Sequence, residues 1–125
     1  MTLTYCISEN HYHTIFSFCC AVPAIIKDKS VREIKFFESV GSDIGLLFQI
    51  ADDLIDFKGN SKIAGKKTKK DQKKGKATLI SLLGYDASIK YCGKIISDIN
   101  RNLKIYGSKS KKLNDTLEFI LNRNK

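Results

Sequence analysis

The stretch that decides the fold is GSDIGLLFQIADDLID, residues 41–56. In and around it, apolar side chains recur at three- and four-residue steps, the spacing of an amphipathic helix. Ser30 and Glu33 have the spacing of a capping box at a helix start. We therefore predict one long helix from about residue 31 to residue 57, ended by Gly59, Asn60 and Ser61. Its apolar positions are Phe37, Val40, Ile44, Leu47, Phe48, Ala51, Leu54 and Ile55.

The rest of the sequence predicts further helices and no strand. Apolar spacing indicates helices over about residues 12–26, 77–83, 87–106 and 110–122, with a break at Gly84. Residues 1–9 are predicted to be irregular. No stretch alternates apolar and polar residues with the two-residue period of a half-buried strand. The predicted class is therefore all-α.

The size and charge of the chain bound its possible functions. Its 125 residues suffice for one domain, and 42% apolar residues exclude wholesale disorder. The net charge of +9 points to an acidic partner: a nucleic acid, an anionic membrane or a phosphorylated small molecule. Seven of the eleven residues from Lys66 to Lys76 are lysine, so an anion site is expected there. The longest nearly apolar run, residues 15–26, is too short to span a bilayer.

The cysteines and the N-terminal sequence bear on location. Cys6, Cys19, Cys20 and Cys92 have no metal-knuckle spacing, and the adjacent Cys19 and Cys20 do not pair easily with each other. The apolar surroundings of Cys19 and Cys20 favour small core residues. No basic residue precedes the apolar run, as one would in a secretory signal. We therefore expect a reducing, cytoplasmic location.

One side of the predicted long helix carries groups suited to a metal ion. At 100° per residue, Gly41, Gly45, Gln49, Asp52 and Asp56 fall on one strip. Two glycines in line inside a helix indicate that something bulky approaches the backbone there. Asp52 and Asp56 repel one another across one turn, and a Mg²⁺ ion between them would reverse the sign of that interaction. Spacing alone favours this interpretation and a solvated acidic helix end about equally.

The lysine-rich segment begins ten residues after Asp56. A carboxylate-bound Mg²⁺ beside several ammonium groups is suited to a diphosphate, because the metal bridges its oxygens and the lysines neutralise the remaining charge. We interpret most of these lysines as solvated. Lys66 and Lys76 differ because each follows a glycine, which allows a sharp turn back toward a site.

Residues 41–56 resemble the second aspartate-rich motif of the trans-prenyl diphosphate synthases, which include the farnesyl and geranylgeranyl diphosphate synthases. The similarity continues through GK at 65–66, KD at 70–71, GKAT at 75–78 and LLG at 82–84. The final ILNRNK resembles the end of bacterial farnesyl diphosphate synthases. The resemblance covers about residues 14–125. It implies an isoprenoid-synthase helical bundle. In such a bundle the diphosphate leaves the allylic substrate, and isopentenyl diphosphate attacks the allylic carbocation that forms.

The same resemblance implies roles for individual residues. Mg²⁺ would be bound by the aspartates of the motif, Asp52, Asp53 and Asp56. The allylic diphosphate would be contacted by Lys66 and Lys76, and the substrate pocket would be lined by Phe48 and Gln49. No side-chain acid or base is implied, because the released diphosphate is thought to take the proton.

The first aspartate-rich motif of that family is missing from these residues, since Asp52-Asp53 is the only Asp-Asp pair. We therefore interpret residues 14–125 as the C-terminal part of a synthase domain and residues 1–13 as an irregular or misaligned segment. One carboxylate helix cannot enclose the three Mg²⁺ ions of the family, so we expect no activity from the chain alone.

Three interpretations follow from the missing motif. Another chain, carrying the N-terminal half, or a second copy could complete the site. Alternatively, the chain is an inactive truncated remnant. A basic module for nucleic acid or an anionic membrane is the weaker interpretation, because no nucleic-acid motif accompanies the lysines.

Overall fold

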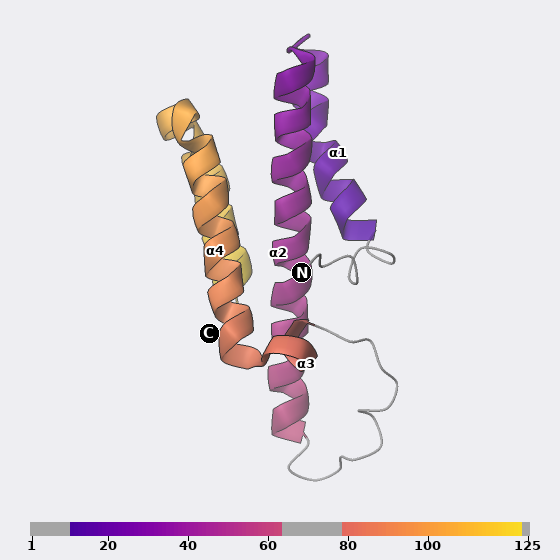
Figure 1. The fold of residues 1–125 in the computed structure, drawn as a ribbon, viewed down its shortest axis with the longest axis vertical. Helices are drawn as coiled ribbons and strands as arrows, with labels where there is room; N and C mark the ends of the chain where they lie inside the picture. The colour runs from indigo at the N-terminus through magenta and orange to yellow at the C-terminus, as the bar shows by residue number, and fades with distance from the viewer. Residues whose placement is uncertain (1–10, 64–78, 124–125) are drawn as a thin grey trace.

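The structure is a computed structural model that describes residues 11–63 and 79–123. Its elements are α1 (His11–Ile26), α2 (Val31–Ile63), α3 (Leu79–Leu83), α4 (Tyr85–Leu103), the 3₁₀ helix η3 (Lys104–Ser110) and α5 (Lys111–Asn122). In Figure 1, α2 runs through the middle of the molecule, with α1 on one side and α4 on the other. The described residues contain no strand, so the predicted all-α class is confirmed.

The long helix α2 starts where the capping box predicted. The backbone amide of Glu33 donates to Oγ of Ser30 at 3.2 Å, and the amide of Ser30 donates to Oε2 of Glu33 at 3.3 Å. The predicted end was wrong, because α2 continues through Gly59 to Ile63. A glycine ends a helix when it adopts a left-handed conformation. Gly84 and Gly107 have positive φ in the described residues, whereas Gly59 does not.

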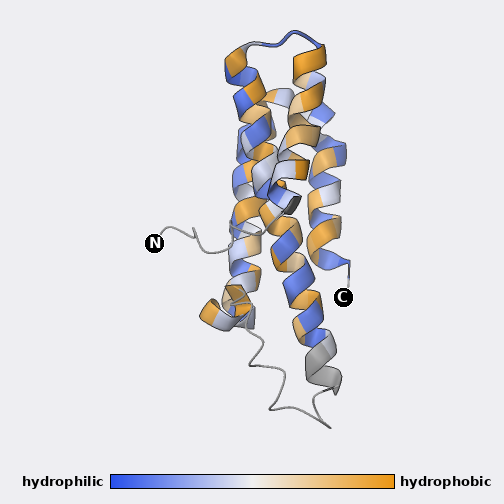
Figure 2. Cartoon of the chain, turned by 90° about the vertical axis from the view of Figure 1, so that its right-hand side faces the viewer, coloured by the Kyte–Doolittle hydropathy of each residue, from blue (hydrophilic) through white to orange (hydrophobic). Residues whose placement is uncertain are grey.

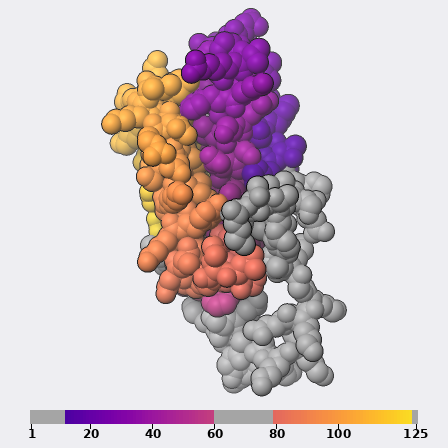
Figure 3. Space-filling model, viewed as in Figure 1, coloured from indigo at the N-terminus to yellow at the C-terminus, as the bar shows by residue number. Residues whose placement is uncertain are grey.

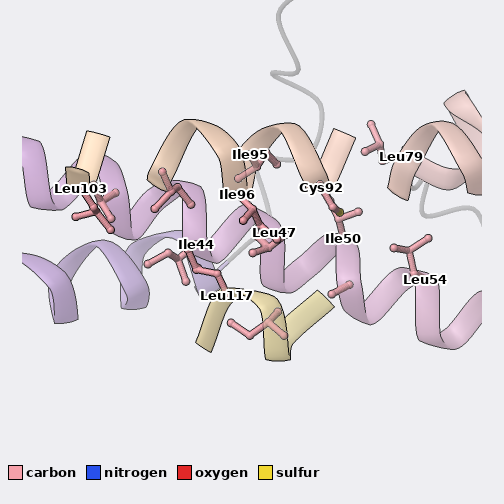
Figure 4. Packing of buried hydrophobic residues seen from close by; sticks show 14 of the residues in the cluster. Ile44, Leu47, Ile50, Leu54, Leu79, Cys92, Ile95, Ile96, Leu103 and Leu117 are labelled. Carbon is pink, nitrogen blue, oxygen red and sulfur yellow. The ribbon is translucent and has the colours of Figure 1, made fainter. Parts of the chain in front are cut away.

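The core lies where α2 meets α4 and α5 (Figure 4). The predicted positions Val40, Ile44, Leu47, Ala51 and Leu54 are all buried. The predicted aromatic and edge positions, Phe37, Phe48 and Ile55, are only half-buried because they lie at the margins of this contact. The opposing helices contribute mainly isoleucine and leucine, namely Ile95, Ile96, Ile99 and Leu103 from α4 and Leu117 and Ile120 from α5.

Backbone contact with α1 explains the two aligned glycines of α2. A Cβ on Gly41 would lie 2.3 Å from the carbonyl oxygen of Phe16, and one on Gly45 would lie 3.0 Å from Cα of His13. The bulky neighbour that the glycine spacing predicted is therefore the backbone of α1. Alongside this contact, Nδ1 of His13 and Oγ of Ser42 share a hydrogen bond of 2.5 Å.

The other face of α1 has no partner in the described part of the chain. Among the described elements, α1 packs against α2 alone. Phe18 is 65% exposed and Ile26 is 72% exposed, with Ile15 and Ile25 also on the surface. Figure 2 views the molecule from the α1 side, and apolar residues recur along the helices seen from there. Cys19 is exposed, so the prediction that it is a core residue was wrong.

A sharp turn at Gly84 separates α3 from α4. Its φ of 85° is readily adopted by glycine, which confirms the predicted break. Figure 3 shows α3 packed at the lower end of α4, beside α2. At its other end α4 stops at Leu103, where η3 replaces the continuous helix predicted to residue 106. None of the described helices combines the length and the apolar character that crossing a membrane requires.

Candidate functional site

The acidic strip consists of Gln49, Asp52, Asp53 and Asp56 of α2. It lies C-terminal to the two glycines of α2 that contact α1. Asp52 and Asp53 are half-buried, whereas Asp56 is exposed one turn further along. Nε2 of Gln49 donates to Oδ1 of Asp53 at 3.2 Å, so the amide and this carboxylate orient each other. The carboxylates of Asp52 and Asp56 thus project from one side of one helix, and solvent reaches both.

The end of α5 brings a cation to this strip that sequence reasoning missed. Nη2 of Arg123 donates to Oδ1 of Asp52 and forms an ion pair with it. The side chain of Arg123 is 22% exposed and that of Asp52 is 38% exposed. The two residues are 71 positions apart, and no periodicity links them. Only the prediction that α5 returns along α2 could have indicated this contact.

Phe48, one turn before Asp52 on α2, contacts residues both from α1 and from the segment directly after α5. Its ring lies 5.3 Å from the ring of Tyr12 and 5.5 Å from that of Phe16, both on α1. The guanidinium carbon of Arg123 lies 4.8 Å from the centre of the same ring, a cation–π distance. The ring of Phe48 therefore lies between α1 and the Asp52–Arg123 ion pair and contacts both α1 and Arg123.

Two hollows near α2 have linings that do not include the aspartates. A cavity of about 70 Å³ lies between α2, α4 and α5, lined by Ala51, Leu54, Ile55, Lys58, Tyr85, Ile89 and Leu121. It is far smaller than the roughly 300–1,000 Å³ of ligand pockets. A shallower hollow of about 390 Å³ lies between α1 and α2, lined in part by His13, Glu38 and Ser42. The aspartates lie in neither hollow, and all three are at least partly exposed to solvent.

The donor set of the strip suits Mg²⁺ but does not make a complete site. Mg²⁺ takes one or two carboxylates and fills its other positions with waters and phosphate oxygens, and Asp52 with Asp56 meets that pattern. Within residues 11–63 and 79–123, no group of three or more His, Cys, Asp or Glu residues could hold a metal ion. The predicted diphosphate ligands Lys66 and Lys76 lie outside the described residues.

A different carboxylate of α2 has a shifted pKa. Burial raises the pKa of Asp43 above its usual range, the nearby His13 opposes this, and the negative charge of Asp98 adds to it. Asp43 is therefore a carboxylate whose ionisation the fold disfavours. It lies between α1 and α4, away from the acidic strip.

In the part of the chain that the structure describes, every regular element is a helix, and Arg123, directly after α5, packs against Asp52 of α2. The family model described as "Polyprenyl synthetase" matches residues 8–118. The chain therefore belongs to the polyprenyl synthetase family, as the resemblance of residues 41–56 predicted.

Two relatives illustrate how much of a family member this chain represents. It is 33% identical over 101 residues to a farnesyl diphosphate synthase of Escherichia coli, which covers 78% of this chain and 34% of that protein. It is 37% identical over 103 residues to the large subunit 2 of a heterodimeric geranylgeranyl pyrophosphate synthase of Arabidopsis thaliana, covering 82% and 27%. The chain thus spans between about a quarter and a third of the length of these relatives.

Proposed function

We propose that residues 14–125 are the C-terminal part of a short-chain prenyl diphosphate synthase, which condenses an allylic diphosphate with isopentenyl diphosphate. The observation that carries this proposal is the placement of Asp52 and Asp56 one turn apart on α2, both accessible to solvent. Membership of the polyprenyl synthetase family supports it. The farnesyl and geranylgeranyl diphosphate synthases among the relatives support the short-chain class.

In this proposal the residues of the strip bind and orient rather than transfer protons. Asp52 and Asp56 hold Mg²⁺, and Asp53 assists while Gln49 fixes its carboxylate. Bound Mg²⁺ would neutralise the charge that develops on the departing diphosphate. Phe48 screens one side of the strip from water with an aromatic surface, which favours a carbocation over its hydrated products.

The diphosphate itself is assigned to two lysines of the basic segment. Lys66 and Lys76 each follow a glycine and would donate to the oxygens of the allylic diphosphate. Ammonium groups beside a Mg²⁺ ion complete the neutralisation of a group that carries three or more negative charges.

A partner is part of the proposal, because one acidic helix cannot surround a diphosphate. The partner would be a chain carrying the first aspartate-rich motif, or a second copy of this chain. The apolar outer face of α1, with Phe18 and Ile15, supports an additional protein layer there. The relative from Arabidopsis is described as a subunit of a heterodimeric enzyme.

Calorimetric titration with inorganic diphosphate, with and without Mg²⁺, tests the proposed site. We expect Mg²⁺-dependent binding that the Asp52→Asn variant weakens at least about tenfold, since a metal ligand is lost. Asp115→Asn, which removes an exposed carboxylate on α5, is the matched control and should bind as the wild type does. Equal binding by Asp52→Asn would assign the diphosphate to the lysines alone.

A prenyl-transfer assay tests the proposed reaction. The chain is mixed with Mg²⁺, isopentenyl diphosphate and a short allylic diphosphate, with and without a separately expressed polypeptide that carries the first motif. We expect product only when that polypeptide is present. A well-folded chain that gives no product in either mixture would identify an inactive remnant.

A further inference from the structure

The guanidinium of Arg123 occupies the position that a cation bound to Asp52 would need. Its Nη2 donates to Oδ1 of Asp52, and its central carbon rests 4.8 Å from the ring centre of Phe48. One side chain thus satisfies the carboxylate by charge and the aromatic ring by cation–π attraction. The positive charge beside Asp52 offsets the repulsion between Asp52 and Asp56.

The contact leaves part of the guanidinium unsatisfied. Nε of Arg123 is buried and has no hydrogen-bond partner among the described residues. An arginine has five N–H donors, and a buried donor without an acceptor costs free energy. The unpaired Nε therefore reduces the net free energy that the contact with Asp52 contributes to holding Arg123 in this place.

A divalent cation on Asp52 would be incompatible with this arrangement. Mg²⁺ keeps several waters in a rigid octahedron and needs room around the carboxylate. A divalent ion and a guanidinium a few ångströms apart also repel one another strongly in a half-buried place. Both effects favour one cation on this carboxylate at a time.

We propose that Arg123 is an internal counter-cation of Asp52 that bound Mg²⁺ displaces, so that metal binding at α2 releases the end of α5. This inference rests on the proposed function, since it takes Asp52 as a metal ligand. It assigns to Arg123 the role of a positioning residue that sets the affinity for the metal and reports its arrival.

Metal titration of variants gives the first test. Mn²⁺ stands in for Mg²⁺ and is followed by electron paramagnetic resonance on the full 125-residue chain. Removing the competitor in Arg123→Gln should tighten Mn²⁺ binding about fivefold, the equivalent of one favourable partly exposed ion pair. Arg101→Gln removes an arginine that pairs with Asp98 on the exposed side of α4, and should change the affinity by less than about twofold.

Arginine side-chain NMR gives a second test that does not depend on activity. The chain has three arginines, Arg32, Arg101 and Arg123, so the labelled spectrum is simple to assign. Addition of Mg²⁺ should shift the Arg123 signals and speed rotation of its guanidinium. Arg101 is an internal control, because it is paired with Asp98 at 2.8 Å on the exposed side of α4 and should not respond.

The outcomes separate this inference from the function on which it rests. If Mn²⁺ binds the wild type and Arg123→Gln equally well, or if Mg²⁺ leaves the Arg123 signals unchanged, displacement is wrong and the metal site stands. If no variant binds the metal, both the proposed site and the displacement are wrong. Tighter binding by Arg123→Gln alone, together with selective release of Arg123, would establish the competition.

Discussion

Gly41 of α2 and Phe16 of α1 are in direct backbone contact. A Cβ atom on Gly41 would lie 2.3 Å from the carbonyl oxygen of Phe16 and 2.6 Å from Cα of Ser17. The carbonyl belongs to a helical backbone that cannot rotate away as a flexible side chain could. Glycine at position 41 therefore sets the separation of α1 and α2, and through it the place of Phe16 against Phe48.

Gly41→Ala should destabilise the chain. The added methyl group must push α1 outward, and overpacking of this kind costs about 1–3 kcal/mol. Urea unfolding monitored by circular dichroism measures the change. The matched control is Gly93→Ala on α4, where no atom lies within 4 Å of the new Cβ and the helix gains about 0.5–1 kcal/mol. A stabilised Gly41→Ala variant would show that α1 does not pack as described.

The sequence predicted those features of the fold that local chemistry decides. The capping box predicted the start of α2, and the glycine pair predicted a close neighbour before α1 could be identified as that neighbour. The end of α2 could not be predicted, since Gly59 ends a helix only if its backbone turns left-handed. Nothing local to Gly59 forces that turn.

The capping box gives the second prediction. Ser30→Ala removes the side-chain oxygen that accepts from the amide of Glu33, and N-cap losses of this kind cost about 0.5–2 kcal/mol. Thermal unfolding checks this value. Ser39→Ala, an exposed serine inside α2, should stay within about 0.5 kcal/mol of the wild type. Equal stabilities of the two variants would mean that packing with α1, and not the cap, holds the start of α2.

The candidate site was predictable only in its local part. The aspartates and Gln49 share a face because helical periodicity places them there, and this arrangement is present in α2. The pairing of Asp52 with Arg123 depends on how α5 returns along α2 after η3, and no residue near Asp52 encodes that path. The lysine ligands Lys66 and Lys76 stay predictions, since they lie outside the described residues.

The outer face of α1 gives a third prediction. Phe18 is 65% exposed among other apolar side chains of α1, so the isolated chain should self-associate as its concentration rises. Phe18→Lys should shift the chain toward monomer in analytical ultracentrifugation, with little change in unfolding temperature. Ile105→Lys is the control, because Ile105 is 80% exposed but lies on η3, away from this face. An equal shift with both variants would indicate a general effect of charge.

The raised pKa of Asp43 gives a fourth prediction. Burial and Asp98 disfavour its ionised form, so its contribution to stability is greatest below the ordinary carboxyl pKa and is lost as pH rises through the folded value. Asp43→Asn should therefore be more stable than the wild type at pH 7, and this advantage should disappear near pH 3. Unfolding titrations at both pH values check this, with Asp115→Asn as the exposed control. A wild type that is the more stable at pH 7 would mean that attraction to His13 outweighs burial.

Cys92 gives the last prediction, at alkaline pH. Its thiol is fully buried between the helices, and burial raises its pKa to about 11. Above about pH 8.5 the unfolded chain releases this proton while the folded chain keeps it, so the free energy of unfolding falls. Between pH 7.5 and 10 the fall due to Cys92 should be about 2 kcal/mol.

Lysines and tyrosines titrate in the same range, so the measured quantity is the difference between the fall in the wild type and that in Cys92→Ala. The small cavity in that variant lowers its stability equally at both pH values and cancels. Cys19→Ala, at an exposed thiol, should keep the full fall of the wild type. Equal falls in the wild type and in Cys92→Ala would place the thiol in contact with water.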